Sequence, residues 1–95
     1  MTIARHYVMI AQEGQEAALR DALVNLAAAV RPLAGCEGVD IFNDPDASAH
    51  FQFVEHWDSV ESHKAAGQAL GKEAFAPVMA VLAGRPEGRY LAPVT

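Results

Sequence analysis

The sequence contains few of the residues that define several common classes of protein. It has one cysteine, Cys36, which excludes an intrachain disulfide and a zinc site built from several thiolates. Only 7 of its 95 residues are lysine or arginine, against 12 aspartates and glutamates, and the formal net charge is −5. Because the basic residues are scattered, no positive stripe is available for a phosphate backbone, and we expect no nucleic-acid partner.

Long apolar runs are also missing. No segment approaches the roughly 20 consecutive apolar residues of a membrane-spanning helix. The segment MTIARHYVMIAQ lacks the charged and long apolar regions of a signal peptide, so we expect a cytoplasmic protein with no membrane partner. His50 and His56 are six residues apart without an evident third ligand, and we therefore expect no metal site.

Apolar residues, in contrast, make up 52% of the chain, and the length suits a single domain over residues 1–95. A chain this short buries only about 60–65% of its extended surface when it folds. We therefore expect a core dense with alanine, an apolar face covered by a partner, or both.

Local patterns predict the order strand, helix, strand, strand, helix, strand. The predicted strands cover residues 3–11, 39–43, 50–57 and 88–94, and the helices cover 15–31 and 58–68, with a further helical piece near 73–82. Asp58 is expected to cap the second helix together with Glu61, and Gly67 and Gly71 are expected to interrupt it. This order is typical of the ferredoxin-like α+β fold, in which helices cover one face of an antiparallel sheet. Because the first strand is partly apolar on both faces, we expect a homodimer formed through the uncovered sheet face.

Residues 51–63, FQFVEHWDSVESH, gather candidate functional side chains between a strand and a helix. Trp57 is either a core aromatic or the wall of a cavity. His63 is either an exposed helix residue or a base directed into that cavity, since histidine titrates near neutral pH. Glu55 shares an apolar strand face with Phe53 and needs a partner, for which Arg5, Arg85 and Arg89 are the candidates. Tyr7 and Tyr90 either belong to the core or offer hydroxyls to a ligand.

Three segments carry a resemblance to a known family. Residues 31–42 (RPLAGCEGVDIF), the pair Asp44-Pro45 and residues 53–59 (FVEHWDS) resemble the antibiotic biosynthesis monooxygenase domain. The resemblance implies a dimeric α+β barrel with a cavity between helices and sheet in each subunit. It also implies that Trp57 lines this cavity. Members of the family include oxygenases that oxidise quinols or polyphenols without metal or flavin, haem-degrading enzymes, and proteins of no known activity.

The resemblance and the residues together support one hypothesis. We expect a cofactor-independent monooxygenase that uses O₂ to oxidise an electron-rich aromatic held against Trp57 and Phe53. His63, or a water that it holds, would act as base, and Tyr7 and Glu55 would complete the substrate site. The family pattern places its helix histidine about three residues later, at Ala66 in this chain.

Three alternatives stay open. The first is a protein that binds a small hydrophobic molecule without converting it. The second is a structural dimer in which Trp57 is simply buried. The third, haem degradation, is weaker, because it calls for an asparagine on the first strand and residues 2–12 contain none.

Overall fold

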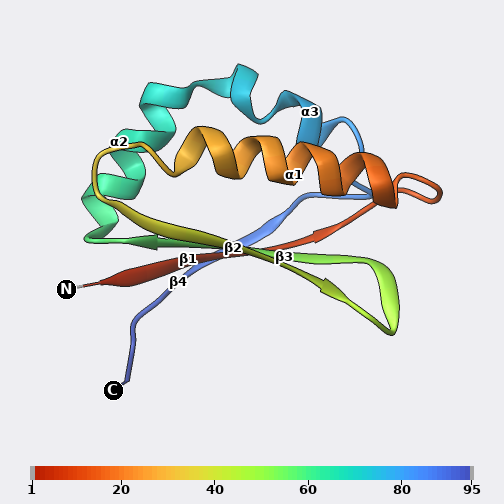
Figure 1. Ribbon diagram of the computed structural model, residues 1–95, viewed down its shortest axis with the longest axis horizontal. Coiled ribbons are helices and arrows are strands. Elements are labelled where there is room, and N and C mark those ends of the chain that lie inside the picture. The colour runs from red at the N-terminus through yellow and green to blue at the C-terminus, as the bar shows by residue number, and fades with distance from the viewer. Residues whose placement is uncertain (1, 95) are drawn as a thin grey trace.

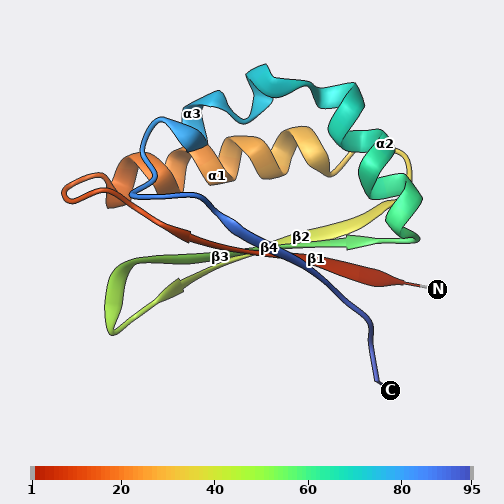
Figure 2. The same ribbon diagram turned by 180° about the vertical axis from the view of Figure 1, so that it is seen from behind.

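The computed structural model describes residues 2–94 and confirms the ferredoxin-like α+β fold (Figure 1). Its elements are β1 (Ile3–Ile10), α1 (Glu16–Val30), β2 (Cys36–Asp44), β3 (Ala47–Trp57), α2 (Val60–Leu70), the 3₁₀ turn η1 (Lys72–Ala74), α3 (Ala76–Met79) and β4 (Glu87–Leu91). The four strands form one antiparallel sheet in the order β2-β3-β1-β4. All the helices cover one face of this sheet, and the described residues leave the opposite face open (Figures 1 and 2).

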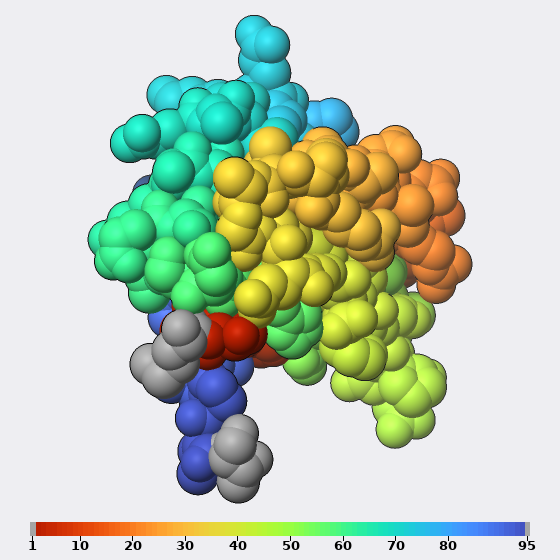
Figure 3. Space-filling view, turned by 60° about the vertical axis from the view of Figure 1, so that its left-hand side comes forward, coloured from red at the N-terminus to blue at the C-terminus, as the bar shows by residue number. Residues whose placement is uncertain are grey.

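The core lies between the helices and the covered sheet face. The largest fully buried side chains are those of Trp57, Phe51, Phe53, Leu19, Leu23, Val30 and Val78. The apolar stripe of α1 supplies three of them, and alternating positions of β3 supply three more, as the periods of helix and strand require. The tip of the β2–β3 hairpin, yellow-green in the space-filling view, projects away from the helical layer (Figure 3).

The start of α2 differs from the prediction. The cap is Ser59, whose backbone is extended and whose hydroxyl accepts a hydrogen bond from the backbone N–H of Ser62 at 3.1 Å. Asp58 lies one residue too early for this role, and its own N–H donates to the carbonyl oxygen of Gly35 at 2.9 Å. The expectation that Asp58 caps the helix is therefore wrong.

The end of α2 also differs. Gly67 lies inside the helix without interrupting it, and the helix continues to Leu70. Gly71, with a positive φ of 74°, then ends it, as expected for the residue type that tolerates this backbone conformation.

The C-terminal third contains shorter elements than predicted. The helical piece expected near residues 73–82 is divided into η1 and α3, and Pro77 lies in the first turn of α3, where proline is tolerated. The last strand ends at Leu91, so Pro93 lies beyond the sheet. In contrast, β2 and β3 are longer than predicted because their pairing continues almost to the hairpin turn. No helix within residues 2–94 has the length and apolar character needed to cross a membrane.

Candidate functional site

A cavity of about 160 Å³ lies between the helices and the covered sheet face. Its lining is mostly aromatic and aliphatic: Tyr7, Met9, Leu26, Phe53, Glu55, Phe75, Val78, Met79 and Pro86. An apolar cavity of about 150 Å³ is large enough to bind benzene. The helix-side cavity, as we name it, can therefore hold one aromatic ring, and the hydroxyl of Tyr7 and the carboxyl of Glu55 are its polar side-chain groups.

A second, much narrower space of about 10 Å³ adjoins this cavity and shares Tyr7, Glu55 and Phe75 with it. Trp57 and His63 border this narrow space and do not line the larger cavity. Its volume is close to the minimum for a single water molecule. The structure thus brings all five predicted site residues together, with Tyr7, Glu55 and Phe53 on the cavity and Trp57 and His63 behind them.

Glu55 is a buried carboxyl group, only 3% exposed. Its Oε1 accepts a hydrogen bond from Trp57 Nε1 at 2.9 Å and lies 3.6 Å from His63 Nε2. Burial raises the pKa of Glu55, while the Trp57 bond and the charge of Arg5 oppose this rise. Among the described residues, no arginine forms the expected ion pair with Glu55, and the indole N–H of Trp57 is its hydrogen-bond donor instead.

His63 points from α2 back toward the sheet. Its ring lies edge-on to that of Trp57, with centroids 5.7 Å apart. Nε2 lies 3.1 Å from the hydroxyl oxygen of Tyr7, and Nδ1 lies 2.7 Å from that of Tyr90. Burial lowers the pKa of His63, and the charges of Arg5 and Lys64 lower it further. The site therefore favours a neutral imidazole, which can accept a proton.

Arg5, which the sequence offered only as one candidate partner of Glu55, is a further member of this site. Its guanidinium lies over two aromatic rings, 5.0 Å from the centroid of Tyr7 and 4.4 Å from that of Tyr90. Its Nε is buried without a hydrogen-bond partner among the described residues. The strand register explains the position, since Arg5 pairs with Glu55 on one side and Tyr90 on the other. Arg5 could have been placed beside Glu55 and Tyr90 only if the pairing of β1 with β3 and β4 had been known.

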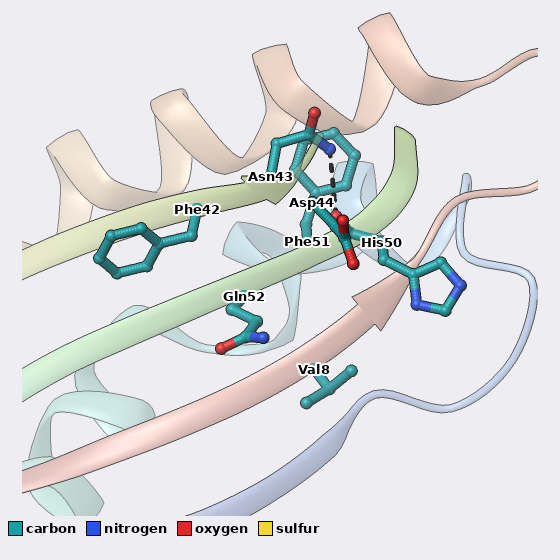
Figure 4. A pocket seen from close by; sticks show the side chains of 7 residues that line it. All are labelled: Val8, Phe42, Asn43, Asp44, His50, Phe51 and Gln52. Carbon is teal, nitrogen blue, oxygen red and sulfur yellow. Dashed lines mark hydrogen bonds between the residues drawn. The ribbon is translucent and has the colours of Figure 1, made fainter. Parts of the chain in front are cut away.

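A larger hollow, of about 430 Å³, lies at the hairpin end of the sheet and contains none of the five predicted site residues. Phe42, Gln52 and Val8 stand on its neighbouring strands (Figure 4). This hollow is shallow, and Phe42 is 56% exposed in it. We therefore regard the smaller helix-side cavity as the candidate substrate site, because it is less open than the hollow and is lined by Tyr7 and Glu55, which both lie close to His63.

The remaining histidines lie on the open sheet face. His56 Nε2 lies 3.0 Å from a carboxylate oxygen of Asp40, and His6 Nε2 lies 2.9 Å from the amide oxygen of Gln52. His50 borders the hollow at the hairpin end. Within residues 2–94, no three side chains of histidine, cysteine, aspartate or glutamate lie together in a group that could hold a metal ion.

The fold and the site define a class: a ferredoxin-like α+β protein with an aromatic cavity between helices and sheet. The chain matches the model of the antibiotic biosynthesis monooxygenase family over residues 2–76. It belongs to this family. No curated protein is significantly similar to it in sequence.

Solved structures place the chain in the same group. A candidate antibiotic biosynthesis monooxygenase from Chloroflexus aurantiacus is 30% identical, with a TM-score of 0.82 and coverage of 100% of this chain and 95% of that one. One from Bordetella bronchiseptica is 20% identical, with a TM-score of 0.86 and coverage of 99% and 98%. SnoaB from Streptomyces nogalater, a cofactor-independent oxygenase, is 10% identical, with a TM-score of 0.83 and coverage of 99% and 94%. At the identities of the last two, the likeness shows the fold alone.

Proposed function

We propose that this protein is a cofactor-independent monooxygenase that oxidises a small electron-rich phenol or quinol with O₂. The observation that carries the proposal is the helix-side cavity, which is lined by aromatic side chains and fits a single ring. Its polar groups, Tyr7 and Glu55, both lie close to Nε2 of His63 in the adjoining narrow space. The family membership and the cofactor-independent activity of SnoaB give further support.

In the proposed reaction the substrate supplies the electrons. The ring lies against Phe53 in the cavity, with its hydroxyl directed toward Tyr7 and Glu55. His63, or a water held in the narrow space beside Trp57, accepts the phenolic proton. The phenolate then gives one electron to O₂, and the two radicals combine to a carbon-bound peroxide, which is protonated and loses water to leave the quinone. The protein deprotonates the substrate, orients it and excludes solvent.

A test begins with Trp57, the single tryptophan of the chain. Hydroquinone or a naphthoquinol is titrated anaerobically, and indole emission is corrected with free tryptophan. Saturable quenching followed by O₂ uptake with the same ligand supports the proposal. Quenching without O₂ uptake would point to a binding protein. No quenching across a panel of quinols would leave Trp57 a core residue and favour the structural dimer.

We also propose that a second copy of the chain covers the open sheet face, forming the dimeric barrel that the sequence resemblance implies. The support is the apolar side chains left uncovered on three strands of that face: Ile10 is 41% exposed, Phe42 56% and Leu91 45%. A single domain over residues 1–95 and a cytoplasmic location stay predictions.

A further inference from the structure

Two tyrosine hydroxyls contact opposite nitrogens of the His63 ring, and together they connect the helix-side cavity with the molecular surface. Tyr7, whose hydroxyl oxygen lies 3.1 Å from Nε2, lines the cavity. Tyr90, whose hydroxyl oxygen lies 2.7 Å from Nδ1, belongs to the edge strand β4 and is 36% exposed. We propose that Tyr7, His63 and Tyr90 form a relay that carries protons between the cavity and the surface beside β4.

The chemistry of a neutral imidazole suits this role. One ring nitrogen then carries a proton and donates, while the other accepts, and either tautomer is compatible with a hydroxyl on each side. A proton can therefore enter at one nitrogen while another leaves from the opposite nitrogen, so the ring never has to hold a full charge. The lowered pKa of His63 agrees with this path, because burial and the Arg5 cation disfavour the imidazolium.

The arrangement is held by residues that take no part in the transfer. Arg5 lies over the rings of both tyrosines, and its charge favours any partial negative charge on their oxygens. Gly88 faces Tyr7 across the β1–β4 pairing, and a Cβ there would lie 2.7 Å from Nη2 of Arg5 and 3.0 Å from the Tyr7 ring. The missing side chain at Gly88 thus leaves room for the stacked guanidinium.

The use of the relay in catalysis rests on the proposed function. Starting with the proton on Nδ1, the substrate hydroxyl gives its proton to Tyr7, Tyr7 gives its own to Nε2, Nδ1 gives its proton to Tyr90, and Tyr90 releases one to solvent. His63 is then the opposite tautomer. When the peroxide forms, one proton moves inward along the same groups to the peroxide oxygen, and the first tautomer is restored. One proton leaves and one returns, so the relay is balanced over each turnover.

The relay itself can be tested without any oxidation. In a mixture of H₂O and D₂O, the ¹³Cζ signal of a tyrosine splits when its hydroxyl proton exchanges slowly and averages when exchange is fast. We expect an averaged Tyr7 signal in the wild-type protein, and a split signal in both Tyr90→Phe and His63→Gln. The control His56→Gln removes a histidine from the open face and should leave the signal averaged. Unchanged Tyr7 exchange in Tyr90→Phe or His63→Gln would overturn the relay.

Turnover distinguishes the relay from the proposed function. Tyr90→Phe should lower kcat for quinol-dependent O₂ uptake by about tenfold to a hundredfold, at or below the low end of acid–base effects, because solvent can partly replace the hydroxyl. Added imidazole should restore the rate, while the Kd from Trp57 quenching stays unchanged. A loss that imidazole does not relieve would indicate a merely structural Tyr90 and contradict the relay. Slowed Tyr7 exchange in the variants with no quinol oxidation by any form would leave the relay standing and refute the proposed function.

Discussion

At the scale of single residues, Glu55 shows how a buried charge shapes this site. Its carboxyl lies among aromatic side chains and has an indole N–H as its hydrogen-bond donor rather than a cation. Its pKa is raised, so the folded state favours the protonated form. The resulting stability is present below the ordinary pKa of glutamic acid and is lost as the pH rises through the folded-state value.

Two substitutions of Glu55 separate its charge from its hydrogen bond. Glu55→Gln retains an acceptor for Trp57 and removes the ionisation, so at pH 7 the free energy of unfolding should stay equal to or exceed that of the wild type. Glu55→Leu leaves the indole N–H buried and unpaired, which should cost about 1–3 kcal/mol. Urea denaturation at pH 4 and pH 7 measures both effects. A Gln variant that is less stable than the wild type only at pH 7 would show that the carboxylate is favoured in the fold.

His63 makes a second prediction at this scale, concerning pH and activity. Because its pKa lies below the ordinary histidine value of 6.5, the neutral base persists into mildly acidic solution. The acid limb of kcat/KM for quinol oxidation should therefore fall below pH 6.5. His63→Gln should remove this limb and lower the rate by about 10²–10⁴.

The raised pKa of Glu55 could produce an acid limb of its own, so Glu55→Gln is the matched control. It should keep the limb if His63 is the base. A loss of less than threefold in His63→Gln would remove His63 from the mechanism.

At the scale of elements, the start of α2 allows Asp58 and Ser59 to be compared directly as helix caps. Ser59 supplies the capping hydrogen bond to the N–H of Ser62, so Ser59→Ala should lower the free energy of unfolding by about 1 kcal/mol. Asp58→Ala should change it by less than about 0.5 kcal/mol, as expected for an exposed site without a cap role. Thermal and urea denaturation of both variants give the comparison. A larger loss of unfolding free energy in Asp58→Ala than in Ser59→Ala would show that Asp58 caps the helix, as the sequence predicted.

The sequence was sufficient for the fold because its periodic patterns are strong. The spacing of Leu19, Leu23 and Leu26 fixes the buried face of α1, and the alternation of Phe51 and Phe53 fixes the buried face of β3. It failed at boundaries, where hydrogen bonds compete locally. Aspartate and serine both cap helices, and only the hydrogen bond from the N–H of Ser62 to the hydroxyl of Ser59 shows which of the two neighbours does so here.

The candidate site was predicted only in part, for a related reason. Phe53, Glu55, Trp57 and His63 could be predicted as site residues because they lie close together in the sequence, at one strand–helix junction. Tyr90 contacts His63, and Arg5 lies over the Tyr90 ring, because β1 pairs with β4, and these two strands are separated by most of the chain. The hydrogen bond between His63 and Tyr90 depends on the angle of α2 over the sheet, and no short-range pattern encodes that angle.

At the scale of the whole molecule, the open sheet face is the main feature that the chain leaves unexplained. The helices cover only one side of the sheet (Figure 2). The other side presents exposed apolar side chains together with the polar pairs His6–Gln52 and His56–Asp40. A small domain buries only a limited share of its surface when it folds, and a second copy of the chain would bury this face as well. A twofold arrangement would place the same patch of each copy against the other.

The proposed dimer predicts a difference between two apolar residues of similar exposure. Phe42 on β2 is 56% exposed on the open face, whereas Val24 on α1 is 52% exposed on the helical side. Phe42→Glu should place like charges at the contact between copies and shift the protein to a monomer, while Val24→Glu should leave the dimer intact. Sedimentation velocity across a range of protein concentrations measures the mass, and far-UV circular dichroism checks that each variant is folded. If the wild-type protein and both variants sediment as monomers at every concentration, the open face is not a dimer interface, and its exposed Phe42 must then be tolerated in solvent or covered by a different partner.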